Sequence, residues 1–301
     1  MSAAPPAFEA APETPLARIA RDFAASALAL AGLAVFGLIL LAALLAPLIA
    51  QQNPYDLAQL DILDSRLPPG AQGANGQTFW LGSDEQGRDV LSAIFYGLRI
   101  SLGVGAISTL VALAIGLSVG LAAGYLGGRT EAVIMRIVDL QLSFPAILIA
   151  LVLLSLLGQG LDKTIFALVA VQWAYYARTV RGAALVERGK EYIEAAQGLA
   201  LSPSRIVFRH LLPNCLPPLI VIATVQVAAA IALEATLSYL GIGVPITEPS
   251  LGLLIKNGFD YMLSGKYWIS FFPGLALVLT IVSINLVGDR LRDILNPRLQ
   301  R

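Results

Sequence analysis

Two acidic side chains fall inside long apolar stretches of the sequence, where a charge is unusual. Asp139 lies in the stretch 134–158, and Glu234 lies in the stretch 215–240. A charged side chain costs about 2.5–3.5 kcal/mol at the centre of a bilayer on insertion scales, so such residues face a protein interior or a water-filled path. Two interpretations stay open for both acids: a place along a pathway, or structural hydrogen bonding in the interior or near the membrane interface.

Other chemistry has little support in the residue types. The chain has one cysteine, Cys215, and one histidine, His210, so it offers no internal disulfide and no Cys/His cluster for a metal. The Gly-Lys pairs at 189–190 and 265–266 lack the rest of a phosphate-binding loop, which needs Gly-x-x-x-x-Gly-Lys followed by Ser or Thr. The sequence therefore predicts no catalytic residue and no cofactor, and any uphill movement of a solute would need another polypeptide or an ion gradient.

Composition assigns the chain to the membrane proteins. Of its 301 residues, 57% are hydrophobic and 13% are charged, whereas a soluble domain carries about 25% charged residues. The net charge is zero and no basic run is present, which argues against a nucleic-acid partner. The first apolar stretch, 23–50, is much longer than the core of a signal peptide, about 7–15 residues, and indicates a retained spanning helix.

An all-α, polytopic membrane protein with six transmembrane helices is the predicted fold class. Each spanning helix needs about 20 mainly apolar residues, and six stretches meet this need: 24–49, 99–124, 134–158, 163–180, 215–240 and 268–288. The second stretch carries glycines at 116, 120 and 124, with another at 128 just beyond. Spacing by four puts them on one face, for close packing within the bundle or against another subunit.

The basic residues orient these helices. With the N-terminus in the cytosol, 14 of the 20 Lys and Arg residues fall on the inside and 6 on the outside, as the positive-inside rule favours. We therefore expect a cytosolic tail over 1–22, a first helix over 23–50 and a periplasmic segment over 51–98. A core permease domain of five helices over 99–290 and a cytosolic tail over 291–301 follow. Residues 1–20 are expected to be disordered, and residues 181–213 to form a cytosolic loop.

This cytosolic loop has the pattern of two helices joined by a turn. Ile193, Ala196 and Ala200 share one helical face, and Glu191 and Glu194 suit its N-terminus, where the helix dipole favours negative charge. Ala195 and Ala196 would present a flat surface to a partner. Ser202 and Pro203 predict the cap and first residue of a second helix that runs to Leu212, before Pro213, Pro217 and Pro218 mark the entry into the next span.

At these residues the sequence resembles a known family. Glu194-Ala195-Ala196, Ile206 and His210-Leu211-Leu212-Pro213 are similar to the EAA loop of ABC importer permeases. The resemblance implies that the loop is a coupling helix that docks into an ATP-binding subunit, with Glu191, Glu194, Ala195, Ala196, Gly198, Ala200, Ile206 and Pro213 as its residues. The family usually has Gly where this chain has Ala200, although Gly198 is near.

A second group of motifs resembles the dipeptide, oligopeptide and nickel permeases, most closely the second permease subunit of peptide importers. Before the second span lie Gly82, Asp84, Gly87, Arg88 and Asp89, where the last three suit a fixed turn with a local ion pair. Further matches cover Val138-Asp139 with Leu142–Pro145, Glu234-Ala235, Gly288-Asp289, Leu291-Arg292-Asp293 and Asn296-Pro297-Arg298. Together the matches extend over about residues 25–300.

The resemblance implies an ABC type I importer permease fold in a bacterial inner membrane, with both termini cytosolic. It further implies a second homologous permease subunit, two ABC ATPase subunits, a periplasmic or lipid-anchored solute-binding protein, and surrounding membrane lipid. The solute would be a dipeptide or oligopeptide, with a nickel chelate or a glutathione-like compound as alternatives. From the residues alone, an ion-coupled secondary transporter and a membrane scaffold without transport remain as rivals.

Overall fold

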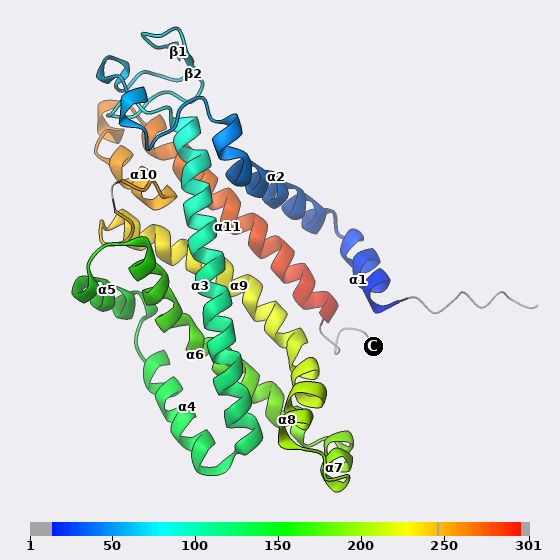
Figure 1. Cartoon of the computed structure of the whole chain (residues 1–301). Helices are drawn as coiled ribbons and strands as arrows, with labels where there is room; N and C mark the ends of the chain where they lie inside the picture. Colours follow the sequence, from blue (N-terminus) through cyan, green and yellow to red (C-terminus); the bar gives the residue numbers. More distant parts are fainter. Residues whose placement is uncertain (1–13, 246, 296–301) are drawn as a thin grey trace, which may run out of the picture.

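The computed structural model describes residues 14–245 and 247–295, and over this range the fold is a long helical bundle with one small hairpin (Figure 1). The long helices are α2 (Ala27–Ile49), α3 (Val90–Leu126), α6 (Leu161–Arg188), α9 (Leu212–Tyr239) and α11 (Trp268–Leu295). Shorter helices are α1 (Pro15–Ala24), α4 (Gly128–Leu142), α5 (Ala146–Leu157), α7 (Glu191–Gly198), α8 (Pro203–Arg205) and α10 (Leu251–Phe259). Between them lie the 3₁₀ turns η1 (Leu57–Gln59), η2 (Ile62–Asp64) and η4 (Met262–Ser264), the π-helix η3 (Ile206–Leu211), and the antiparallel strands β1 (Ala71–Gln72) and β2 (Thr78–Phe79).

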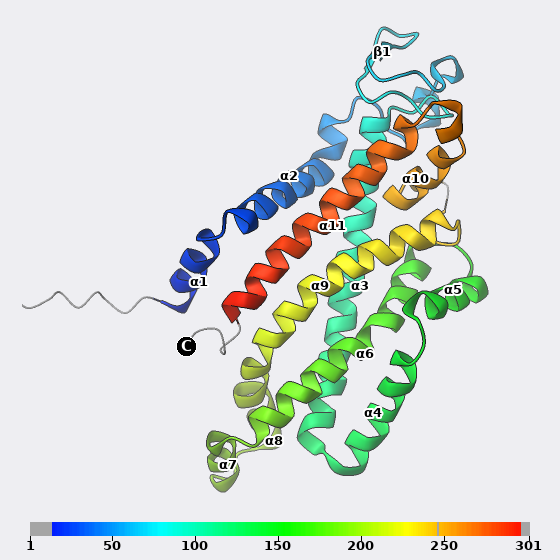
Figure 2. The same ribbon diagram turned by 180° about the vertical axis from the view of Figure 1, so that it is seen from behind.

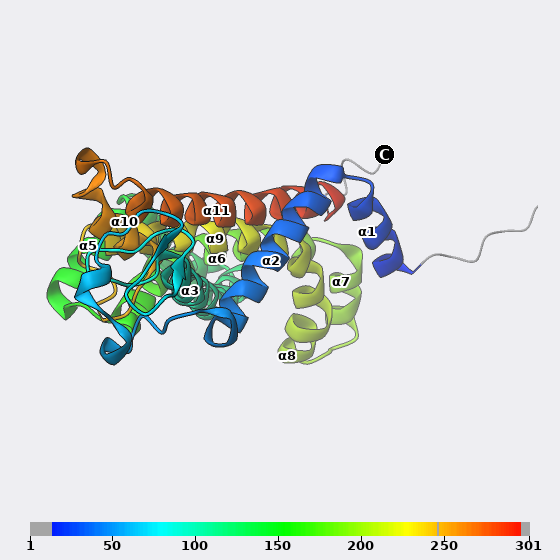
Figure 3. The ribbon, with the colours of Figure 1, turned by 90° about the horizontal axis from the view of Figure 1, so that it is seen from above.

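The hairpin and the short helices α7 and α8 lie at opposite ends of the bundle (Figure 1). We call these the hairpin end and the elbow end. The helices α6 and α9 run side by side away from the elbow end (Figure 2), and α2 lies along the outside of α3 and α11, as the view from the hairpin end shows (Figure 3). The segments 51–89 and 189–205 therefore lie at opposite ends of the bundle, and their placement on opposite sides of a membrane stays a prediction.

Four single helices among the described residues are long and apolar enough to span a membrane: α2, α3, the continuous helix Pro203–Tyr239 and α11. The bent pair α4 and α5 would make a fifth span. The predicted fourth span, 163–180, lies within α6, which is helical throughout but carries too many polar residues to join this group. The count of six apolar spans is therefore confirmed only in part.

The third predicted span is broken rather than continuous. Helices α4 and α5 meet at an angle of 88° across residues 143–145. Pro145 has no N–H to donate and restricts the backbone of Phe144 before it, while the Ser143 hydroxyl donates back to the Asp139 carbonyl oxygen at 2.6 Å. Only the second half, α5, is strongly apolar, whereas the first half carries Arg136, Asp139 and Gln141, and the two were predicted as one span because together they reach the required length.

Three further boundaries differ from expectation. Helix α3 starts nine residues before the predicted 99, because the Asp89 carboxylate caps its first turn by accepting from the Ser92 N–H at 2.8 Å. Residues 15–20, which were expected to be disordered, belong to a separate helix, α1, which spans Pro15–Ala24 and is capped by Thr14. The C-terminal tail begins later than predicted, since α11 continues to Leu295, and the Asn296-Pro297-Arg298 motif lies outside the described residues.

The glycine face of α3 packs within the chain. A Cβ atom built on Gly120 would lie 2.6 Å from the Ala177 carbonyl oxygen, and one built on Gly124 would lie 2.6 Å from the Ala184 Cβ. Gly116 faces the same helix, α6, at Trp173 and Tyr176. Of the two interpretations of this spacing, close packing inside the bundle is therefore the one that the fold bears out.

Candidate functional site

The predicted coupling loop forms a compact elbow between α6 and α9. Its first helix, α7, spans Glu191–Gly198, and a tight turn then leads into α8 (Figure 1). Ile193, Ala196 and Ile206 are buried against one another, with Leu201 and Tyr125 packed alongside. The two arms of the elbow therefore share a small apolar core, which also contacts the end of α3 and makes the elbow one body with the bundle.

This core corrects the expected flat surface at Ala195 and Ala196. Ala196 is only 4% exposed and faces the second arm of the elbow, whereas Ala195 is exposed. The free face of α7 carries Glu191, Glu194 and Ala195. A partner that approaches the elbow would therefore meet two carboxylates and a small side chain, while Ala196 holds the elbow together.

The turn of the elbow depends on a strained residue. Ala200 has φ of +54°, in the left-handed region that L side chains rarely adopt. Its side chain is exposed and lies outside α7, so it does not extend the buried face as the spacing predicted. The family usually has Gly at this position, and the positive φ gives the physical reason for that preference. Gly198, in contrast, is the last residue of α7 and needs no special conformation.

The second arm of the elbow does not end at Leu212 as predicted. Pro203 begins a helix that passes through the π-helical turn Ile206–Leu211 and continues to Tyr239. Ser202 holds the N-cap position, but its hydroxyl makes no capping hydrogen bond. Because Pro213 cannot donate to the carbonyl four residues earlier, the wider π turn, in which the Leu212 N–H reaches the Val207 carbonyl, lets the chain pass without a break.

A hydrogen-bond network ties this arm to the end of α6. The Glu187 carboxylate accepts from Lys190 Nζ at 2.6 Å and from the Tyr192 hydroxyl at 2.6 Å, and Asn214 Nδ2 donates to that hydroxyl at 3.1 Å. Partial burial opposes ionisation of Glu187, but the donors Lys190 and Tyr192 outweigh it and lower its pKa. Burial and the bond to Glu187 raise the pKa of Tyr192 to about 12. Sequence reasoning missed this network, since the i,i+3 pair Glu187 and Lys190 crosses a helix boundary and Asn214 is 22 positions from Tyr192.

The two acids that could have lined a pathway have different surroundings. Glu234 is fully buried, and its carboxylate accepts from the Ser101 hydroxyl at 2.8 Å and from the Ser238 hydroxyl at 2.7 Å. The Ser101 oxygen also accepts from the Leu251 N–H at 3.4 Å, so Glu234 joins α9, α3 and α10. Asp139 is exposed on α4 and pairs with Arg178 of α6. Glu234 thus faces the bundle interior, and Asp139 links two helices near the surface.

The motif at the hairpin end forms a fixed turn, but the partner of Arg88 in its ion pair is Asp84 and not Asp89 of the predicted triplet. Arg88 Nε lies 2.7 Å from Asp84 Oδ2, and both side chains are only 5% exposed. Gly87 has φ of +77° and lies directly against the Asp61 carbonyl, and Gly82 lies against Trp268. Asp89 caps α3, and its burial raises its pKa although Ser92 donates to it. These five residues are buried where the segment 51–89 packs against the bundle.

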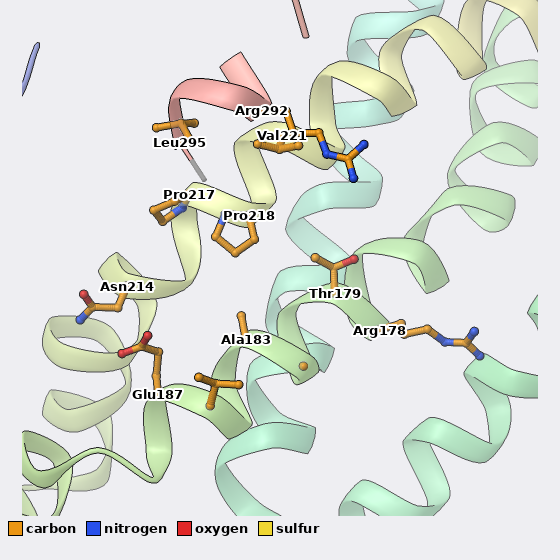
Figure 4. Close-up of a pocket in the computed structure, with 12 residues that line it drawn as sticks. Arg178, Thr179, Ala183, Glu187, Asn214, Pro217, Pro218, Val221, Arg292 and Leu295 are labelled. Atoms are coloured by element: carbon orange, nitrogen blue, oxygen red, sulfur yellow. The ribbon is translucent and has the colours of Figure 1, made fainter. Parts of the chain in front are cut away.

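A cavity of about 650 Å³ opens beside the elbow, between α6, α9 and α11 (Figure 4). Thr179 and Glu187 line it from α6, Asn214 and Pro218 from α9, and Arg292 from α11. The sequence predicted no role for the motif Leu291-Arg292-Asp293. Arg292 reaches the cavity because α11 packs against α9. Over the described residues, no group of three or more His, Cys, Asp or Glu side chains could hold a metal ion.

Sequence similarity to known proteins extends over nearly the whole chain. The family described as binding-protein-dependent transport system inner membrane component matches residues 116–301, and the N-terminal TM domain of oligopeptide transport permease C matches residues 14–69. The di/tripeptide transport system permease protein DppC of Pseudomonas aeruginosa is 38% identical over 288 residues, covering 95% of this chain and 93% of that relative. The dipeptide transport system permease protein DppC of Bacillus subtilis is 36% identical over 274 residues, covering 91% and 83%.

A solved structure shares the fold. The inward-facing MetNI methionine ABC transporter matches with a TM-score of 0.55 and 23% sequence identity, covering 66% of this chain and 94% of that one. At this identity the similarity concerns the fold alone, and it supports the importer permease architecture that the EAA-like loop implied. The family match covers more than half of the chain and includes the elbow, α9 and α11. This chain belongs to the family of binding-protein-dependent transport system inner membrane components, as a membrane-spanning, non-catalytic ABC permease subunit.

Proposed function

We propose that this permease imports dipeptides or oligopeptides and is driven through its elbow by separate ATPase subunits. Relatives named as dipeptide, di/tripeptide and oligopeptide transport system permeases support the solute class. The elbow supports the drive, because it packs around its own apolar core at one end of the bundle and exposes Glu191 and Glu194 on α7. The complete importer would contain a second homologous permease subunit, two ATPase subunits and a solute-binding protein at the hairpin end, with both termini of this chain in the cytosol.

One observation carries the mechanism: the elbow and the far side of the bundle share a single helix. The continuous helix Pro203–Tyr239 has 37 residues, so it is about 55 Å long at 1.5 Å per residue, longer than the hydrocarbon core of about 30 Å. One end carries Ile206 in the elbow core, and the other carries Glu234 in its contact with α3 and α10. A push on α7 would move this helix as a unit, because packed elements shift as bodies.

The electrostatics of α7 suggest how an ATPase subunit would bind. Glu191 and Glu194 project from the face that the elbow core leaves free, so a basic groove in the partner is the complementary surface. The Glu187 network anchors the same helix to α6. Displacement of α7 would therefore act on α6 and α9 together, the two helices that flank the cavity of Figure 4.

Transport in membrane vesicles tests the proposal. Vesicles that contain the chain with its ATPase and partner permease subunits should take up a dipeptide when ATP and the solute-binding protein are supplied, and uptake should persist after proton and sodium gradients are collapsed. Uptake that follows an ion gradient instead would establish the secondary transporter. Preference for a nickel chelate or glutathione over peptides would refute the solute class while leaving the ATP-driven mechanism intact.

A charge reversal on the elbow tests the coupling surface. Glu194→Lys should weaken co-purification with the ATPase subunit and lower uptake, with membrane insertion unchanged, because it reverses one of two exposed charges on α7. Asp162→Lys changes the same charge at an exposed position in the first turn of α6, outside the elbow, and serves as the control. If Glu194→Lys leaves both co-purification and uptake at the level of the control, α7 is not the docking surface. A bulky residue at Ala196 is less informative, because it would disturb the elbow core.

A further inference from the structure

The cavity between α6, α9 and α11 combines a free cation with hydrogen-bond acceptors. Its volume of about 650 Å³ lies within the range of about 300–1,000 Å³ typical of small-molecule sites. Apolar side chains such as Ala183 and Val221 form much of the wall, and polar groups project at a few points (Figure 4). A small solute with both charged and apolar parts would fit such a lining.

Arg292 supplies the cation. Its guanidinium is directed over the cavity toward Thr179, whereas the guanidinium of Arg178 points away from the cavity (Figure 4), toward α4, where it pairs with Asp139. Within the part of the chain that the structure describes, Arg292 makes no ion pair and no side-chain hydrogen bond. A guanidinium in this state offers its planar fork to a carboxylate, which it binds through two parallel hydrogen bonds.

The α9 wall supplies an acceptor. Pro217 and Pro218 line the cavity, and neither can donate the helical hydrogen bond to the carbonyl four residues earlier. The carbonyl oxygen of Asn214, which also lines the cavity, therefore lacks its regular donor, since residue 218 is a proline. The negative charge of Glu187 is already engaged, since Lys190 and Tyr192 donate to its two oxygens. The free groups of the cavity thus favour a ligand with a carboxylate and N–H donors.

We propose that this cavity binds a short peptide on its way through the permease, with Arg292 holding the terminal carboxylate of the peptide. The inference rests on the proposed function and adds a solute-recognising residue that belongs to the permease itself. It also gives a role to the Leu291-Arg292-Asp293 motif. Since the cavity lies beside the elbow, the site would open or close with the movement of α6 and α9.

Equilibrium binding of two matched probes tests the site. The assembled transporter, without its solute-binding protein, is placed in phosphatidylcholine nanodiscs and titrated with dialanine and with dialanine amide, which lacks the carboxylate. The wild type should bind dialanine about tenfold more tightly, the effect of one charge-assisted bidentate contact. Arg292→Gln should abolish this preference. Arg136→Gln should keep it, because Arg136 is an exposed arginine of α4 that does not line the cavity.

Three results would overturn the inference. The first is equal binding of the two probes to the wild type, and the second is an unchanged preference in Arg292→Gln. The third result has two parts: Arg292→Gln leaves dialanine binding in phosphatidylcholine nanodiscs unchanged, and it weakens the binding of phosphatidylglycerol. Together they would mean that the Arg292 guanidinium binds lipid headgroups. Peptide uptake by wild-type vesicles is measured in parallel, so that loss of the site and failure of the peptide importer itself can be told apart.

Discussion

The close contact of α3 with α6 predicts a sharp response to one added methyl group. In Gly120→Ala, the new Cβ would lie 2.6 Å from the Ala177 carbonyl oxygen and 2.7 Å from the Val180 Cβ, whereas ordinary contacts begin at about 3.4 Å. The two helices would have to separate by about 0.8 Å, the difference between these distances. The Ala177 carbonyl belongs to the backbone of α6 and cannot rotate away. Overpacking of this kind costs about 1–3 kcal/mol.

A second glycine of the same helix separates this cost from helix propensity. Gly103 also lies in α3, but a Cβ built there meets no atom within 4 Å. Gly103→Ala and Gly120→Ala gain the same intrinsic helix propensity, up to about 1 kcal/mol. The difference in unfolding free energy between the two variants therefore reports the α3–α6 contact alone. We expect Gly120→Ala to be less stable than Gly103→Ala by about 1–3 kcal/mol.

Unfolding of the purified chain in mixed micelles measures this difference. Wild type, Gly103→Ala and Gly120→Ala are titrated with sodium dodecyl sulfate and followed by circular dichroism and tryptophan fluorescence. The midpoint should fall for Gly120→Ala and stay or rise for Gly103→Ala. Equal midpoints for the two variants would refute the tight packing of the glycine face, and with it the conclusion that this face is used inside the chain.

Three further predictions concern the elbow and the turn at the hairpin end. Ala200→Gly should stabilise the elbow by about 1 kcal/mol, since it relieves a left-handed alanine, and hydrogen exchange of α7 should slow accordingly. Asp84→Asn should cost about 3–5 kcal/mol, because it leaves the buried Arg88 without its partner charge, and should sharply reduce the folded yield. Glu187→Gln should remove a pH dependence of the stability of the elbow. Because the pKa of Glu187 is lowered in the folded protein, its stabilising contribution is present above the unfolded pKa and is lost as pH falls through the folded pKa. Hydrogen exchange of α7 should therefore accelerate in acid only in the wild type.

Each of these predictions has a result that would contradict it. Faster exchange in Ala200→Gly would mean that chain entropy outweighs the relieved strain. A normal yield of Asp84→Asn, equal to that of Asp56→Asn at a partly exposed site without an ion pair among the described residues, would mean that the ion pair contributes little to the turn. Acid sensitivity that survives in Glu187→Gln would place its origin in another carboxylate.

The structure places the separate sequence motifs on helices that pack against one another. The elbow core, the Glu187 network and the Glu234 contacts lie along two neighbouring helices, α6 and α9. The turn around Asp84 and Arg88 fixes the other end of α3, the helix against which α6 packs most extensively. Movement at the elbow would therefore be transmitted to a bundle whose far end is held in place.

The sequence alone determined the class of the protein and most of its elements. A low charge content and long apolar stretches require a membrane environment whatever the packing, and local rules fixed the glycine face at Gly116–Gly124, the turn at Gly87 and the start of α8 at Pro203. Family motifs located the elbow. Each of these signals acts over a few residues, so a linear reading is sufficient to find it.

Only the tertiary structure decided which side chains face a partner and which face the interior. Ala195 and Ala196 are indistinguishable by residue type, yet Ile206 covers one and leaves the other exposed. Glu234 meets Ser101 across 133 positions of sequence, and Arg292 reaches the wall that Pro218 forms on another helix. Burial and contact depend on where distant helices pack, and no local pattern contains that information.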